Sequence, residues 1–149
     1  MIKLLQKFGP SSIVLALALL IVVGCATTNV SSQQGIKVTL TGDQEVPPVK
    51  TSASGSASFV ISSDKSVSGS VITTGLEATA AHIHEAAKGA NGPVIVPLTK
   101  TADNTWSASA GAKLTDAQYA SYLAGNLYVN VHSAANKGGE IRAQLTPVK

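Results

Sequence analysis

The three histidines of the chain are the residues best suited to chemistry, and two of them are separated by a single residue. His82 and His84 occupy positions i and i+2 of a short β-like run, so in a strand both would project from the same face. His132 ends a later run in which Tyr128 and Asn130 share its face. If the two strands approach one another, the three imidazoles converge.

Converging imidazoles predict a transition-metal site. Three nitrogen ligands leave one position for water or a carboxylate, and imidazole binds both zinc and copper well. We expect Glu140, across the final hairpin, to be the fourth ligand or to orient an imidazole from the second layer. The only methionine is Met1 and the only cysteine is Cys25, so a soft site for Cu⁺ is not available and zinc or Cu²⁺ fits better.

The same histidines also have a structural interpretation. They lie near strand ends beside glycine-rich turns, where an imidazole can hydrogen-bond to a backbone or carboxylate group and hold a loop in place. The sequence leaves both interpretations open, because convergence of the rings depends on strand pairing. Alanine at His82 and His84 distinguishes them, since only a metal site predicts a loss of bound metal.

The rest of the chain offers little further chemistry. Glu140 and Arg142 lie two residues apart and could pair, or could brace the loop at Gly89–Pro93. No nucleophile elbow, phosphate-binding loop or carboxylate pair with a companion base is visible, so hydrolase activity has no positive indication. No basic run with interleaved aromatics occurs, which argues against nucleic acid as a partner.

Cys25 follows a segment with the order of parts of an export signal. Lys3 and Lys7 precede an apolar stretch over residues 13–23, which is shorter than the roughly 20 residues that a membrane-crossing helix needs. The sequence VVGC that ends at Cys25 resembles the lipobox of bacterial lipoproteins, whose cysteine is acylated, for example with palmitate, and becomes the new N-terminus.

This resemblance predicts the organisation of the N-terminal part. We expect a lipoprotein signal peptide over residues 1–24 and a lipidated N-terminus with a flexible polar tether over residues 25–35. The membrane is then a partner through lipidated Cys25, and the location is the cell envelope. Ala26 after the cysteine resembles the outer-membrane sorting preference of many Gram-negative lipoproteins.

From residue 36 onward the pattern is that of short β-strands. Ile36–Thr41 alternates apolar and polar residues, and Ala53–Ile61 with Ser66–Thr74 predicts a hairpin. One short helix is predicted over Leu114–Leu123, with Thr115 as its N-cap and Gly125 as its stop. Further strands are expected at Ala81–His84, Val94–Leu98, Thr105–Ala110, Leu127–His132 and Glu140–Leu145.

These elements predict an all-β fold, an immunoglobulin-like or superoxide-dismutase-like antiparallel β-sandwich or barrel with one short helix. A chain of 149 residues with 44% hydrophobic and 13% charged residues has room for one such domain.

Three phrases of the domain resemble one family. They are GDQEVPP at 42–48, AHIH at 81–84 followed by NGPV at 91–94, and YVNVH at 128–132 followed by GGEIR at 138–142. Together they resemble the CHRD domain, which is named for repeats in the signalling antagonist chordin. The resemblance implies a CHRD domain over residues 36–149 and a β-sandwich, and it implies no enzymatic activity.

A second, shorter resemblance concerns the paired histidines. The string HIHE at 82–85 is similar to the copper-binding strand of copper/zinc superoxide dismutases, although the chain lacks their fourth copper histidine, histidine-rich zinc loop and disulfide.

The predicted function is that of a membrane-anchored CHRD-domain lipoprotein, acting as a binding or structural module that holds a transition metal, with an envelope protein as a further partner. The alternative is a small envelope metalloenzyme that uses copper or zinc and could be redox-active.

Overall fold

The computed structural model describes residues 34–148, so the predicted signal peptide and the lipidation site at Cys25 lie outside the described residues. The described part contains eight strands, one α-helix and a short 3-10 turn. The strands are β1 (Ile36–Thr41), β2 (Ser54–Ile61), β3 (Val67–Thr74), β4 (Ala78–Glu85), β5 (Val94–Ala102), β6 (Thr105–Ala108), β7 (Leu127–Ser133) and β8 (Ile141–Leu145), with α1 (Asp116–Leu123) before β7.

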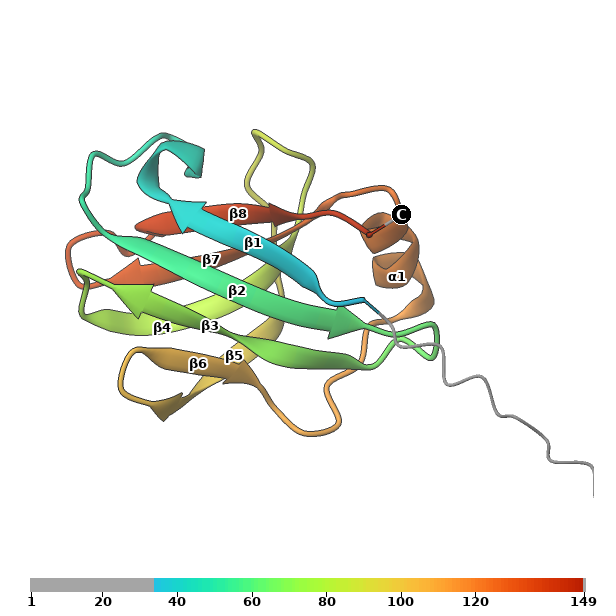
Figure 1. The fold of residues 1–149 in the computed structure, drawn as a ribbon. Helices are drawn as coiled ribbons and strands as arrows, with labels where there is room; N and C mark the ends of the chain where they lie inside the picture. The colour runs from blue at the N-terminus through green and yellow to red at the C-terminus, as the bar shows by residue number, and fades with distance from the viewer. Residues whose placement is uncertain (1–33, 149) are drawn as a thin grey trace, which may run out of the picture. The chain divides into compact units, whose positions relative to one another are not determined.

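All eight strands pair antiparallel and close into a barrel in the order β1-β2-β3-β6-β5-β4-β7-β8 (Figure 1). β8 pairs with β7 along its whole length and meets β1 at Thr41, which lies opposite Arg142. The predicted all-β class, with one short helix, is therefore confirmed at the level of an antiparallel barrel. The predicted hairpin of β2 and β3 is also confirmed, with Ile61 opposite Val67 at its turn.

The barrel interior is filled by the apolar half of each alternating strand. Leu40, Phe59, Val71, Ile83 and Val129 are all fully buried. They are joined in one apolar cluster by residues from every strand and by Leu114 and Tyr122 beside and within the helix. Because successive residues of a strand point to opposite faces, the neighbours of these core residues project outside the barrel.

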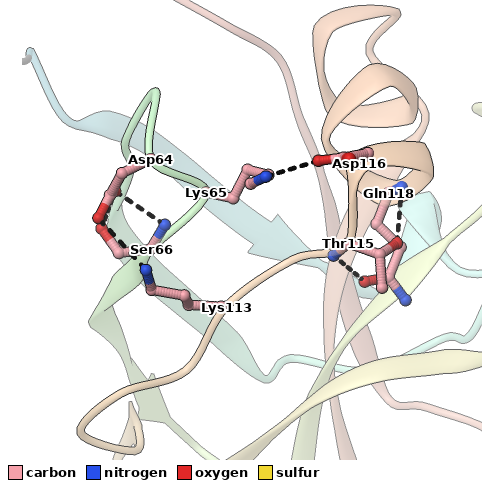
Figure 2. A network of polar contacts seen from close by, with 7 residues as sticks. All are labelled: Asp64, Lys65, Ser66, Lys113, Thr115, Asp116 and Gln118. Carbon is pink, nitrogen blue, oxygen red and sulfur yellow. Dashed lines mark hydrogen bonds and ion pairs between the residues drawn. The ribbon is translucent and has the colours of Figure 1, made fainter.

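The helix forms where the sequence predicts it, because its start is capped locally. The Thr115 hydroxyl accepts from the Gln118 amide, and the Gln118 side chain accepts from the Thr115 amide, which is a capping box (Figure 2). Lys65, in the turn between β2 and β3, pairs with Asp116 and ties this turn to the first turn of the helix. Gly125, with a φ of 76°, follows the helix end as predicted.

The strands β7 and β8 are covered on both faces, and this feature positions the candidate site. Every residue of β7 is buried, although alternate residues point outside the barrel. The connection from β1 to β2 and the connection from β4 to β5 rise on the same side of the barrel and cover this outer face (Figure 1). Asn91 joins the two connections through a hydrogen bond from its Nδ2 to the Val46 carbonyl.

Several boundaries differ from the predicted ones. β4 begins at Ala78 rather than Ala81, and β5 extends to Ala102, because cross-strand pairing continues beyond the apolar runs. β8 begins at Ile141, which leaves Glu140 in the turn before it. In the part of the chain that the structure describes, no helix has the length and apolar character that crossing a membrane requires.

Candidate metal centre

The three histidines lie on the outer face of two neighbouring strands. β4 and β7 pair antiparallel, with His82 opposite Asn130 and His84 opposite Tyr128, while His132 follows Asn130 by two residues. The intervening residues point into the core and are fully buried, among them Ala81, Ile83, Val129 and Val131. Strand pairing therefore brings together the three imidazoles that period-two alternation places on one face.

The imidazoles form one close group. The His82 and His132 ring centroids are 4.8 Å apart, those of His82 and His84 are 5.5 Å apart, and those of His84 and His132 are 6.1 Å apart. One ring nitrogen from each histidine lies within 4.8 Å of the other two. His84 and His132 are 7% and 9% exposed, whereas His82 is half-buried, so the group opens toward solvent at His82.

Two backbone carbonyls determine which nitrogens are free. Nδ1 of His132 is 2.9 Å from the Lys137 carbonyl, and Nδ1 of His84 is 2.9 Å from the Gly92 carbonyl. A carbonyl only accepts, so in both neutral rings Nδ1 carries the proton and Nε2 has the lone pair. Nε2 of His132 accepts from Nδ1 of His82 at 2.9 Å. Nε2 of His84 is buried and has no hydrogen-bond partner among the described residues.

Burial keeps the group neutral. Removal from water, together with the neighbouring His132 and His84, lowers the pKa of His82 to about 4. Burial also lowers the pKa of His84 and of His132, and in each ring the carbonyl bond to Nδ1 opposes this effect. All three rings therefore present neutral imidazole nitrogens near pH 7, which is the form that binds metal ions.

The side chains of Tyr128 and Arg142 stack beside the His84 ring. The Tyr128 ring lies parallel to the His84 ring with centroids 4.8 Å apart, and the Arg142 guanidinium lies 3.4 Å above the Tyr128 ring. Arg142 also donates to the Ala90 carbonyl and to Oδ1 of Asn91. The predicted bracing of the Gly89–Pro93 loop by Arg142 is thus confirmed.

Glu140, predicted as the fourth ligand or as an orienting group, lies outside the close group of histidines in this structure. It is absent from the group of side chains whose ligand atoms lie within 4.8 Å of one another. Its Oε1 accepts from the Thr51 hydroxyl at 2.8 Å, and Ser133 and Asn136 help to lower its pKa. The reason is tertiary: the turn before β8 directs this carboxylate toward the β1–β2 connection.

Two residues of the site were not predicted. Asn130 is 1% exposed and lies directly beside the histidines. Its position on the same strand face as His132 could have identified it from the sequence. Glu45 is 4% exposed and lies in the β1–β2 connection, where burial raises its pKa to about 7 against the opposing charge of Arg142. Only its position within the phrase GDQEVPP pointed to it.

The comparisons with known proteins agree with the resemblance seen in the sequence. The family model of the CHRD domain matches residues 36–145, which is the whole barrel. No curated protein and no solved structure matches the chain. Because this match covers most of the chain and includes every strand, the protein belongs to the CHRD-domain family.

Proposed function

We propose that this protein is a membrane-anchored module of the bacterial cell envelope whose CHRD domain binds a transition metal ion, zinc or Cu²⁺, through His82, His84 and His132. The observation that carries the metal site is the convergence of three neutral imidazoles, one of which has a buried nitrogen without a partner in the described part of the chain.

The geometry is close to what such an ion requires. A tetrahedral ion with bonds of about 2.05 Å holds nitrogen ligands about 3.3 Å apart. Nδ1 of His82 and Nε2 of His132 are 2.9 Å apart, and one nitrogen from each ring lies within 4.8 Å of the other two, so ring movements on the order of 1 Å reach this spacing. The ion would then replace the hydrogen bond between these two nitrogens, and the His82 proton would move to Nε2. The carbonyls of Gly92 and Lys137 hold His84 and His132 in the tautomer whose lone pair is on Nε2, as hydrogen-bond acceptors behind the ligands do in metal sites.

A purely structural role explains less. It accounts for the Nδ1 bonds of His84 and His132, which do fix the adjacent loops. It does not account for Nε2 of His84, which has no partner within residues 34–148, because a buried acceptor without a donor costs about 1–3 kcal/mol. A bound cation removes this cost.

Elemental analysis and titration test the metal site. The full-length protein in detergent is titrated with zinc and with Cu²⁺, beside His84→Ala and beside Lys88→Ala as a control in the adjacent exposed connection. We expect one equivalent in the wild type and in Lys88→Ala, and at least a tenfold loss of affinity in His84→Ala. Absence of binding in the wild type would leave the histidines structural and direct attention to protein partners.

The membrane anchor is supported by the basic start, the apolar stretch and the lipobox-like sequence at Cys25. In a bacterial host, we expect the protein to incorporate labelled palmitate and to be recovered with membranes. In a Gram-negative host, we expect it in the outer-membrane fraction. Cys25→Ser should lose the label, and equal labelling of both forms would contradict the anchor.

The binding module is preferred to the metalloenzyme. An enzyme needs an open metal position beside a substrate cavity. The cavity of about 430 Å³ under the β1–β2 and β4–β5 connections has no histidine in its lining, which includes Glu45, Lys88, Arg142 and Gln144.

We also propose that the barrel is superoxide-dismutase-like, on the basis of the paired histidines of β4. An envelope protein partner would bind a face of the barrel, because a closed barrel has no open edge.

A further inference from the structure

Asn130 occupies the centre of the histidine group. It lies opposite His82 in the pairing of β4 with β7, and it precedes His132 by two residues on the same outward face. His84 is its diagonal neighbour, since His84 pairs with Tyr128. The four side chains therefore form one patch on two adjacent strands, in which Asn130 is the most deeply buried at 1% exposed.

The Asn130 amide has a defined orientation. Its Nδ2 donates to the Gly138 carbonyl at 3.3 Å, and the amide lies beside the Glu45 carboxyl, whose pKa it lowers. Gly139 makes room for this arrangement, because a Cβ at that position would lie 2.3 Å from Oε1 of Glu45 and 2.5 Å from Nδ2 of Asn130. With its nitrogen held in this way, the amide presents its oxygen on the opposite side.

The amide oxygen has no donor among the described side chains. Oδ1 of Asn130 is buried and has no hydrogen-bond partner among residues 34–148, and the same is true of Nε2 of His84. The Asn130 side chain is close enough to affect the pKa of His84. Nε2 of His84 cannot donate to it in the neutral ring, since the proton is on Nδ1 at the Gly92 carbonyl. Two buried acceptors on neighbouring residues are stabilised by a cation that binds both.

We propose that Oδ1 of Asn130 supplies the fourth ligand of the metal centre, which then consists of three imidazole nitrogens and one amide oxygen. This inference rests on the proposed metal-binding function. Asn130 takes the position that the sequence assigned to Glu140, and Glu45 is a positioning residue that helps to orient the amide.

The ligand set has chemical consequences. All four ligands are neutral and none is a thiolate or thioether, so the site selects a divalent ion such as zinc or Cu²⁺ over Cu⁺. Four protein ligands complete a tetrahedral shell, as in structural zinc sites, whereas catalytic zinc keeps a position for water. The centre is therefore closed, which is consistent with a binding module.

Metal competition and cobalt spectroscopy test the ligand. The full-length protein in detergent is titrated with zinc against a chromophoric chelator, and its Co²⁺ form is examined by visible absorption, which reports coordination number. The variants are Asn130→Ala, which removes the oxygen, and Asn130→Asp, which keeps one. Asn126→Ala is the matched control, since Asn126 lies before β7 and outside the patch. Circular dichroism checks that each variant is folded.

We expect Asn130→Ala to weaken zinc binding at least tenfold and to change the cobalt spectrum. Asn130→Asp and Asn126→Ala should keep the affinity within a few-fold or increase it, with a wild-type-like spectrum. If both Asn130 variants bind as the wild type does while His84→Ala loses binding, the fourth-ligand role is overturned and the metal site stands. If the wild type itself binds neither zinc nor cobalt, both proposals fall.

Discussion

At the scale of single residues, the Arg142 side chain on the outer face of β8 is held by protein groups instead of water. Arg142 is 1% exposed, yet its guanidinium donates to the Ala90 carbonyl and to Asn91 and lies over the Tyr128 ring. Such a residue is costly to bury and is retained where its fixed fork of donors holds a loop.

Replacing Arg142 with lysine should therefore destabilise the domain. A lysine cannot make both hydrogen bonds and the planar contact at once, so we expect the free energy of unfolding to fall by about 2–3 kcal/mol. Urea unfolding measures this, with Lys88→Ala as a surface control that should change it by less than about 0.5 kcal/mol. Equal stability of Arg142→Lys and wild type would mean that these bonds do not hold the loop.

Glu45 gives a pH-dependent prediction. Burial raises its pKa from 4.5 to about 7, so between these pH values the folded state binds more protons than the unfolded state. The stabilisation that protonated Glu45 contributes to the folded state is complete below pH 4.5. It is lost as the pH rises through 7, and the free energy of unfolding falls by no more than about 3 kcal/mol. Glu45→Gln should remove this slope while keeping the shape of the side chain.

The measurement is the difference between wild type and Glu45→Gln in urea unfolding from pH 4.5 to 7.5, without metal. The histidines have lowered pKa values and therefore the opposite slope below about pH 6.5, and the subtraction removes their contribution. Arg142 and Asn130 are the groups that face Glu45; over this range the guanidinium stays charged and the amide stays neutral. Parallel curves for the two proteins would contradict the raised pKa.

At the scale of elements, the connections between strands hold the side chains that the strands project outward. The β4–β5 connection supplies the Gly92 carbonyl to His84, and the Gly92 amide donates to the Tyr128 hydroxyl at 3.2 Å. Gly92 has no space for a side chain, because a Cβ would lie 1.9 Å from the Glu85 carbonyl oxygen. The position of this loop and the orientation of His84 are thus linked.

Gly92→Ala should lower both stability and metal affinity. The clash with backbone must move the loop, so we expect a loss of about 1–3 kcal/mol in the free energy of unfolding and weaker zinc binding. Gly138→Ala is the matched control, since a Cβ at that position meets nothing within 4 Å. Thermal melts and zinc titration measure the two effects, and a Gly92→Ala protein with unchanged zinc affinity would separate the loop from the site.

At the scale of the whole molecule, the apolar core and the polar site lie on opposite faces of the same strands. Ile83 and Val129 fill the barrel, while their neighbours His84 and Asn130 form the site outside it. A metal ion that bridges β4 and β7 therefore binds only when these strands are paired. Metal binding and folding are coupled for this reason.

Zinc should accordingly stabilise the whole domain. At a free concentration of 100 times the dissociation constant, the free energy of unfolding is expected to rise by about 2.7 kcal/mol, with a higher Tm. A chelator should reverse the increase, and His132→Ala should show little of it. A zinc-induced rise of equal size in His132→Ala would indicate binding elsewhere on the chain.

The sequence by itself determined the local features. Alternation with period two located the strands and placed His82 with His84 on one face, and Thr115 located the start of the helix, because these signals depend on residues a few positions apart. The three phrases of the CHRD domain were also sufficient for the family, which the family model confirms over residues 36–145.

Only the tertiary structure decided how these parts combine. The pairing of β4 with β7 brings His132 to residues some 50 positions earlier in the chain, and no local signal specifies it. The cover over the outer face, which buries Asn130 and directs Glu140 to Thr51, depends on two connections distant in sequence. Local preferences specify which face a side chain occupies, whereas packing between distant segments decides what that side chain meets.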